Sequence, residues 1–165
     1  MRRDNRGFSL VELIVVVLIM AIVAVALAPQ VMKWVENSRI ASDLQTQGEL
    51  ENACKLAMAD DEAFSVVANG GYSILITKGL STSYETNVKC FDKDGNSNDA
   101  VINADPFFSK FFEVNGYNDY DDFQNAISLK CTPVTGDDII MQVFVYEGGH
   151  TFSQLEGFSS SEIGS

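Results

Sequence analysis

The feature that most constrains this chain is an unbroken run of 16 apolar residues at positions 13–28. Counted from Phe8, the segment has 21 residues, and a helix of that length extends ~32 Å at ~1.5 Å per residue. The hydrocarbon core of a bilayer is ~30 Å thick, so one such helix crosses it. Arg2, Arg3 and Arg6 precede the segment, and positive charges hold a short flank in the cytoplasm. The sequence predicts a single membrane-spanning helix with the rest of the chain outside.

The composition of the chain excludes several function classes. Its 165 residues include 11 basic and 23 acidic side chains, a formal net charge of −12. A direct nucleic-acid site is not expected, because phosphate binding requires clustered lysine and arginine. The only histidine, His150, follows two glycines and is interpreted as a turn residue, which leaves no multi-histidine metal site and no catalytic triad. We expect a folded, non-enzymatic protein.

The apolar segment is compatible with two kinds of processing. An ordinary secretory signal peptide has a basic flank, an apolar stretch and a small-residue motif, for which Ala26-Leu27-Ala28 qualifies. Pro29 would then follow the cut directly, and the run slightly exceeds the usual ~7–15 residues. Glu12 also places a carboxylate inside the apolar segment, where it is costly and serves no purpose in export. These features disfavour the ordinary signal peptide.

Residues 7–12, with the sequence Gly-Phe-Ser-Leu-Val-Glu, resemble the class III leader of type IV pilins and pseudopilins. In that family a prepilin peptidase cuts after the glycine and methylates the new terminal amine. The resemblance implies cleavage between Gly7 and Phe8, methylation of Phe8, and a role in assembly for Phe8 and Glu12. Removing three arginines and one aspartate would change the side-chain net charge from −12 to −14.

The resemblance also implies an organisation and a function. We expect a cleaved leader (1–7), a transmembrane and filament-core helix (8–29) and a globular head (30–165), with a helix kink at Pro29. The chain would be a structural subunit of a type IV pilus-like filament, first in the cytoplasmic membrane and then outside the cell. Its partners would be the prepilin peptidase, identical or homologous subunits and the inner-membrane assembly machinery. Two alternatives stay open: a pseudopilin of a type II secretion or DNA-uptake system, and a membrane-anchored or secreted binding domain that does not polymerise.

The pairing of Glu12 has more than one interpretation. Phe8 and Glu12 are one helical turn apart, so the carboxylate and the new amine can pair within one chain, and the helix dipole alone also favours a glutamate there. A pair between chains would instead set the register of an incoming subunit. The family resemblance favours the pair between chains.

The rest of the chain predicts an α+β fold in which a long amino-terminal helix packs on a small antiparallel sheet. Residues 30–62 have an apolar face at helical spacing and should end near the acidic cluster at 60–62. Strands are expected at 72–77, 84–91, 126–131 and 139–146, the last two forming a hairpin through a turn at 136–138. Asp105 and Pro106 predict the start of a helix. Its four phenylalanines are expected in the core, and the aspartates at 119, 121 and 122 in a solvated loop.

Two further sites are predicted outside the leader. Cys90 and Cys131 each end an expected strand, so they are the candidate disulfide, although a reducing source would leave all three cysteines free. Cys54 is expected as a buried thiol on the apolar helix face. No cofactor is required by the function, but the acidic loop at 92–105 is a candidate calcium site, because Ca²⁺ prefers carboxylate and amide oxygens. Its predicted ligands are Asp94, Asn96, Asn98 and Asp105.

Overall fold

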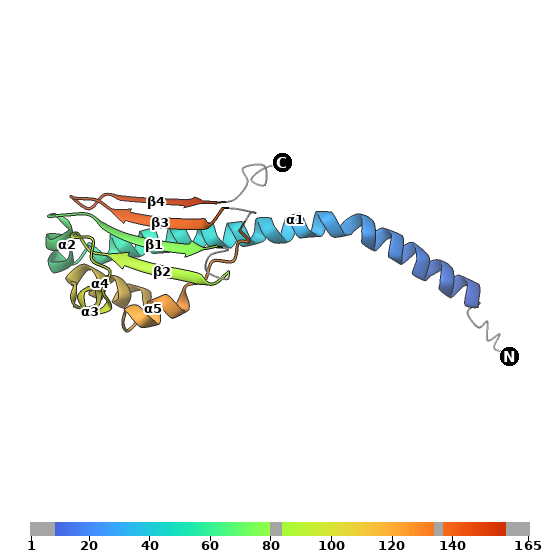
Figure 1. The fold of residues 1–165 in the computed structure, drawn as a ribbon, viewed down its shortest axis with the longest axis horizontal. Coiled ribbons are helices and arrows are strands. Elements are labelled where there is room, and N and C mark those ends of the chain that lie inside the picture. Colours follow the sequence, from blue (N-terminus) through green and yellow to red (C-terminus); the bar gives the residue numbers. More distant parts are fainter. Residues whose placement is uncertain (1–8, 80–83, 134–136, 158–165) are drawn as a thin grey trace, which may run out of the picture.

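The computed structural model describes residues 9–79, 84–133 and 137–157, and consists of one long helix carrying a small α+β head at its carboxy-terminal half (Figure 1). The long helix, α1, spans Leu10–Ala57. The head adds a four-stranded antiparallel sheet and four short helices. This is the predicted pilin-like fold class. Gly7 and Phe8 lie outside the described residues.

The long helix differs in environment along its length. Its first half projects away from the head, whereas its second half lies along the sheet (Figure 1). Pro29 does not end α1, which continues through it. The helix ends at Ala57, slightly before the acidic cluster that was expected to stop it. Those acidic residues begin the next helix, α2 (Asp61–Val67), where Asp60 caps the backbone amides of Glu62 and Ala63.

The sheet has the strand order β2-β1-β3-β4, with every neighbouring pair antiparallel. Three of its strands were predicted from the sequence: β1 (Tyr72–Lys78), β2 (Thr86–Phe91) and β3 (Ile139–Val145). The fourth, β4 (Thr151–Glu156), was missed. It pairs with β3 across a turn in which Gly148 and Gly149 adopt left-handed backbone conformations, with φ of 81° and 82°. His150 belongs to this turn, as expected, and its carbonyl accepts from Tyr146 N.

The predicted strand at 126–131 and its hairpin with 139–146 are wrong. Residue 126 ends helix α5 (Tyr120–Ala126), and residues 127–131 run without a strand partner along α1. From residue 129 to 131 the backbone donors use side-chain acceptors instead. Leu129 N donates to Thr86 Oγ1 at 3.0 Å, and Lys130 N donates to both carboxylate oxygens of Asp43.

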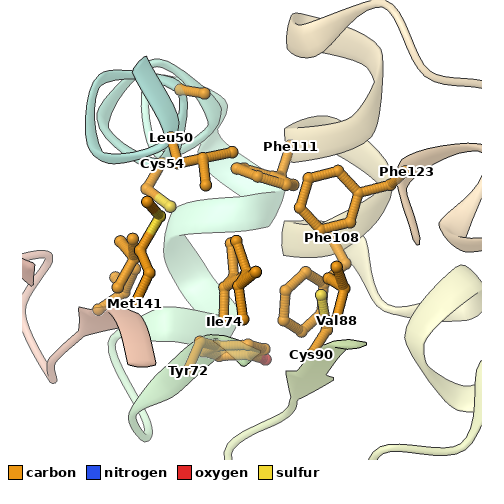
Figure 2. Packing of buried hydrophobic residues seen from close by; sticks show 14 of the residues in the cluster. Leu50, Cys54, Tyr72, Ile74, Val88, Cys90, Phe108, Phe111, Phe123 and Met141 are labelled. Carbon is orange, nitrogen blue, oxygen red and sulfur yellow. The ribbon is translucent and has the colours of Figure 1, made fainter. Parts of the chain in front are cut away.

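The core lies between α1, the inner face of the sheet and the short helices (Figure 2). Helix α4 (Pro106–Asn115) begins at Asp105, as predicted, and buries all four of its phenylalanines. They form a network of stacked and edge-on ring contacts that reaches Tyr72 of β1 and Phe123 of α5. From α1 the core receives Leu50 and Cys54 on the predicted apolar face. The core interpretation of the four phenylalanines is therefore confirmed.

Several acidic and amide side chains begin helices rather than lying free in solvent. Asp105 caps α4, Asn98 caps α3 (Asp99–Ala104) and Asp119 caps α5. Each accepts from backbone amides in the first turn, which would otherwise have no partner. The aspartates at 119, 121 and 122 are exposed to solvent, as predicted, but they form the start of a helix, so the predicted loop is wrong.

Asp43 is the polar contact that fixes residues 130–132 to α1. Its side chain is only 1% exposed, and it accepts from Lys130 N at 2.9 and 3.0 Å and from Cys131 N at 2.8 Å. Two helical turns earlier, Glu36 Oε1 accepts from Thr132 N at 2.7 Å. The two carboxylates therefore replace a strand partner for this part of the chain.

Replacing Asp43 should destabilise the head. Asp43→Ala removes the acceptor of the buried amide of Cys131 and of the partly buried amide of Lys130, and we expect it to lower the free energy of unfolding by about 3 kcal/mol. Urea unfolding of the full chain in detergent, followed by circular dichroism, measures the change. The matched control is Glu49→Gln, an exposed carboxylate on the same helix, which should change stability by less than ~0.5 kcal/mol. Equal effects for the two variants would contradict this role of Asp43.

Candidate functional site

The first turn of α1 contains the glutamate that the leader motif requires. Ser9 is the N-cap residue of the helix, in an extended conformation. Glu12 is three residues further on, and its Oε2 accepts from Ser9 N at 3.0 Å. The carboxylate therefore has a backbone partner in the isolated chain and lies at the helix end where a negative charge is favourable. Phe8, its other predicted partner, lies outside the described residues.

The surface of α1 from Leu10 to Val35 is mostly apolar and is exposed along its whole length. An 18-residue window of this helix has a mean hydropathy of 3.2, with none of its residues buried, so α1 is long and apolar enough to cross a membrane. Leu10 is 72% exposed and Val25 is 77% exposed. Ala21, Ala24 and Ala28, at i, i+3 and i+7, form a strip of small residues that lets another helix approach closely. A folded monomer gains nothing from such a surface, which requires lipid or protein to cover it.

The structure leaves the three cysteines as free, buried thiols. Cys54 is buried as predicted, and burial raises the pKa of its thiol to about 12. The predicted bridge between Cys90 and Cys131 is not formed. Cys90 lies in β2. Burial is the main cause that raises the pKa of the Cys90 thiol, and the electrostatic influence of Cys54 raises it further. Cys131 lies beside α1, where burial and a hydrogen bond to Asp43 raise the pKa of its thiol.

The predicted calcium ligands are distributed over two helix caps and an exposed loop. Asn98 Oδ1 accepts from Ala100 N, and Asp105 Oδ1 accepts from Phe107 N and Phe108 N. Asp94 forms an ion pair with Lys93. Among the described residues, no group of three or more His, Cys, Asp and Glu side chains is placed to hold a metal ion. The calcium site stays a prediction.

The residue that organises this loop is Asp92, which the sequence analysis did not select as a ligand. Its Oδ1 accepts from Asp94 N at 2.9 Å and from Asn96 N at 2.8 Å, and its Oδ2 accepts from Asn96 Nδ2 at 2.9 Å. Burial acts to raise the pKa of Asp92, but the hydrogen bonds from Asn96 and Asp94 outweigh it and hold the pKa below its ordinary value. The charged form of Asp92 therefore stabilises the folded loop.

Sequence reasoning also missed Glu36 and Asp43, which lie seven residues apart and so on one face of α1. This spacing was a usable signal, because both carboxylates continue, at intervals of seven residues, the face of α1 on which Leu50 and Ala57 are buried. Their partners, at residues 130–132, are not adjacent in sequence and could not be inferred from periodicity.

Comparison with known proteins identifies the amino-terminal segment. Residues 2–28 match the family model described as the prokaryotic N-terminal methylation motif, which is the class III signal peptide of type IV pilins and pseudopilins. Neither the curated proteins nor the solved structures gave a match. The chain thus carries the leader of a type IV pilin-like precursor. That motif points to a structural subunit, implies processing by prepilin peptidase and assembly with pilin subunits, and supports membrane anchoring of the precursor.

The hydrogen bonds of Asp92 should make loop stability depend on pH. Because its pKa is lower in the folded than in the unfolded chain, its contribution is present above ~pH 4 and is lost as the pH falls through the folded pKa. Thermal unfolding of the full chain in detergent should show Asp92→Asn less stable than wild type at pH 7, with the difference shrinking towards pH 3. Asp94→Asn, whose side chain is 64% exposed, is the control and should differ little at either pH. A difference between Asp92→Asn and wild type that is the same at both pH values would contradict the assignment.

Proposed function

We propose that this chain is a structural subunit of a type IV pilus-like surface filament, cleaved after Gly7 and polymerised through α1. The observation that carries the proposal is the uncovered apolar surface of α1 between Leu10 and Val35, which begins with the leader motif and Glu12. A membrane covers this surface in the precursor. In the proposed filament the same surface packs against the corresponding helices of neighbouring subunits.

An anchor that does not polymerise needs its apolar surface covered by the membrane only, and never by the helices of neighbouring subunits. Such an anchor would insert more favourably without Glu12, because a carboxylate in an apolar stretch costs several kcal/mol in lipid or is neutralised. The strip of small residues at 21, 24 and 28 is likewise of use only to a helix that packs against another helix. Both features favour assembly over simple anchoring.

The hydrogen bond from Ser9 N to Glu12 Oε2 bears on how assembly is proposed to work. A single backbone amide, Ser9 N, donates to Glu12 among the described residues, and it satisfies only one lone pair of a carboxylate that has about four acceptor sites. Cleavage would create a charged amine at Phe8, with a reference pKa of ~7.7–8.0 that keeps it largely protonated near neutral pH. We propose that Glu12 of one subunit pairs with the amine of its neighbour, so that neither charge remains unpaired in the filament core.

The acidic head would then decorate the outside of the filament. Pseudopilins share this leader, and the length and location of the fibres are what separate a surface pilus from a short periplasmic pseudopilus. Isolation of sheared extracellular fibres containing this chain therefore tests the proposed function directly.

Cleavage should occur between Gly7 and Phe8. Glycine leaves the scissile backbone unhindered, so Gly7→Val should leave an unprocessed precursor in the membrane when the chain is expressed with a prepilin peptidase. Intact-mass analysis should find the wild-type chain beginning at a methylated Phe8. A mature chain that begins at Pro29 would instead identify an ordinary signal peptide and contradict the proposal.

Glu12→Ala should separate processing from assembly. The variant should insert and be cleaved like wild type, because the cut lies before it, yet the yield of sheared filaments should fall by more than about tenfold when the paired charge is lost. Glu49→Gln, on the exposed surface of the same helix, is the matched control and should assemble normally. A normal filament yield from fully cleaved Glu12→Ala would exclude the assembly role of the carboxylate.

A further inference from the structure

We propose that residues 31–35 of α1 form an interfacial anchor, in which Trp34 lies in the lipid headgroup layer at the outer face of the membrane. The inference rests on the membrane anchoring of the proposed function and adds to it the position of the helix in the bilayer. The occupant of this surface is the headgroup and glycerol region of the lipids.

The length of the uninterrupted helix places Trp34 at this depth. Because α1 continues through Pro29, the rise of ~1.5 Å per residue puts Ala28 ~27 Å and Trp34 ~36 Å from Leu10 along the axis. The hydrocarbon core is ~30 Å thick, and the two headgroup regions bring the total to ~40–45 Å. With Leu10 at the inner edge of the core, Trp34 lies ~6 Å beyond its outer edge.

The side chains of this segment have the chemistry of a membrane interface. Beyond the apolar run, Met32 is 73% exposed, Trp34 is 63% exposed and Val31 and Val35 are each 46% exposed. Gln30 and Asn37, four residues before and three after Trp34, share its side of the helix, and Lys33 is its exposed neighbour. The indole thus lies at the border between apolar and polar side chains. Tryptophan prefers this border in a bilayer, and a lysine beside it reaches the phosphates.

The position of the head agrees with this depth. Glu36, which accepts from Thr132 N, is two residues beyond Trp34, or ~3 Å further along the helix. This hydrogen bond between α1 and the head therefore lies just outside the headgroup layer. A deeper Trp34 would pull the acidic head into the lipid, and a shallower one would leave the apolar side chains of residues 31–35 in water.

Trp34 is the only tryptophan of the chain, so its fluorescence reports its depth without labelling. The full chain is reconstituted into phosphatidylcholine vesicles that contain lipids brominated either near the headgroup or deep in the acyl chain. We expect a blue-shifted emission, stronger quenching by the shallow bromines than by the deep ones, and weak quenching by aqueous iodide. The matched control is the double variant Met20→Trp with Trp34→Phe, which moves the indole ~21 Å inwards, to the middle of the ~30 Å core, and should reverse the order of the two brominated lipids.

The outcomes separate this inference from the function on which it rests. Vesicle flotation is measured on the same samples. A chain that does not float with the vesicles would refute both the anchoring and the position of Trp34. A chain that floats while Trp34 is quenched by iodide and not by brominated lipid would overturn only the position. If the deep bromines quench Trp34 most strongly, as they should in the control variant, the proposed position of Trp34 would also be overturned. Iodide protection only at high protein-to-lipid ratio would assign the segment to contacts between subunits instead.

Discussion

The structure depends on one constraint, which is that a single continuous helix of 48 residues serves two different media. Its second half gives Leu50, Cys54 and Ala57 to the core of the head, whereas the first half buries none of its large apolar side chains. Covering each of those is worth about 1.5–3 kcal/mol, and together they amount to tens of kcal/mol. This exceeds the net stability of an ordinary domain. The first half therefore requires lipid or protein to cover it, whereas the second half is already covered by the core of the head.

The acidic composition serves the fold as well as its solubility. Asp43 and Glu36 bind the backbone of residues 130–132 to α1, and Asp60, Asp105 and Asp119 begin helices. Each of these carboxylates accepts from backbone amides in the first turn of a helix or in residues 130–132, a role that protonation weakens. A net charge of −12 opposes folding through self-repulsion. Here much of that charge is placed where it satisfies donors that the helices and the strandless segment leave open.

The sequence allowed prediction of those elements whose causes are local. The long helix, β1, β2, β3 and α4 follow from periodicity and from the Asp-Pro start of α4. The error at 126–131 has a physical origin, because alternating apolar residues produced a strand pattern while the amides of Lys130 and Cys131 are bound by Asp43, 87 and 88 residues away. Strand β4 was missed because it is an edge strand with mixed side chains. The leader was predicted from residue types that occur together, and the match of residues 2–28 to the family model confirms this prediction from sequence alone.

The two ends of the uncovered surface explain why an apolar helix contains Glu12 at all. Moving α1 from lipid into a bundle of helices exchanges one apolar environment for another, so the hydrophobic effect contributes little to that step. The driving force must then come from close packing along the strip of small residues and from polar groups that are better satisfied in the assembly. In the proposed filament Glu12 would supply such a group at the inner end, whereas Trp34 and Lys33 would favour the lipid interface at the outer end. Under these two proposals, extraction of a subunit from the membrane opposes the interfacial preference of residues 33–34 with the charge pairing of residue 12, and the balance between them sets how readily a subunit leaves the bilayer.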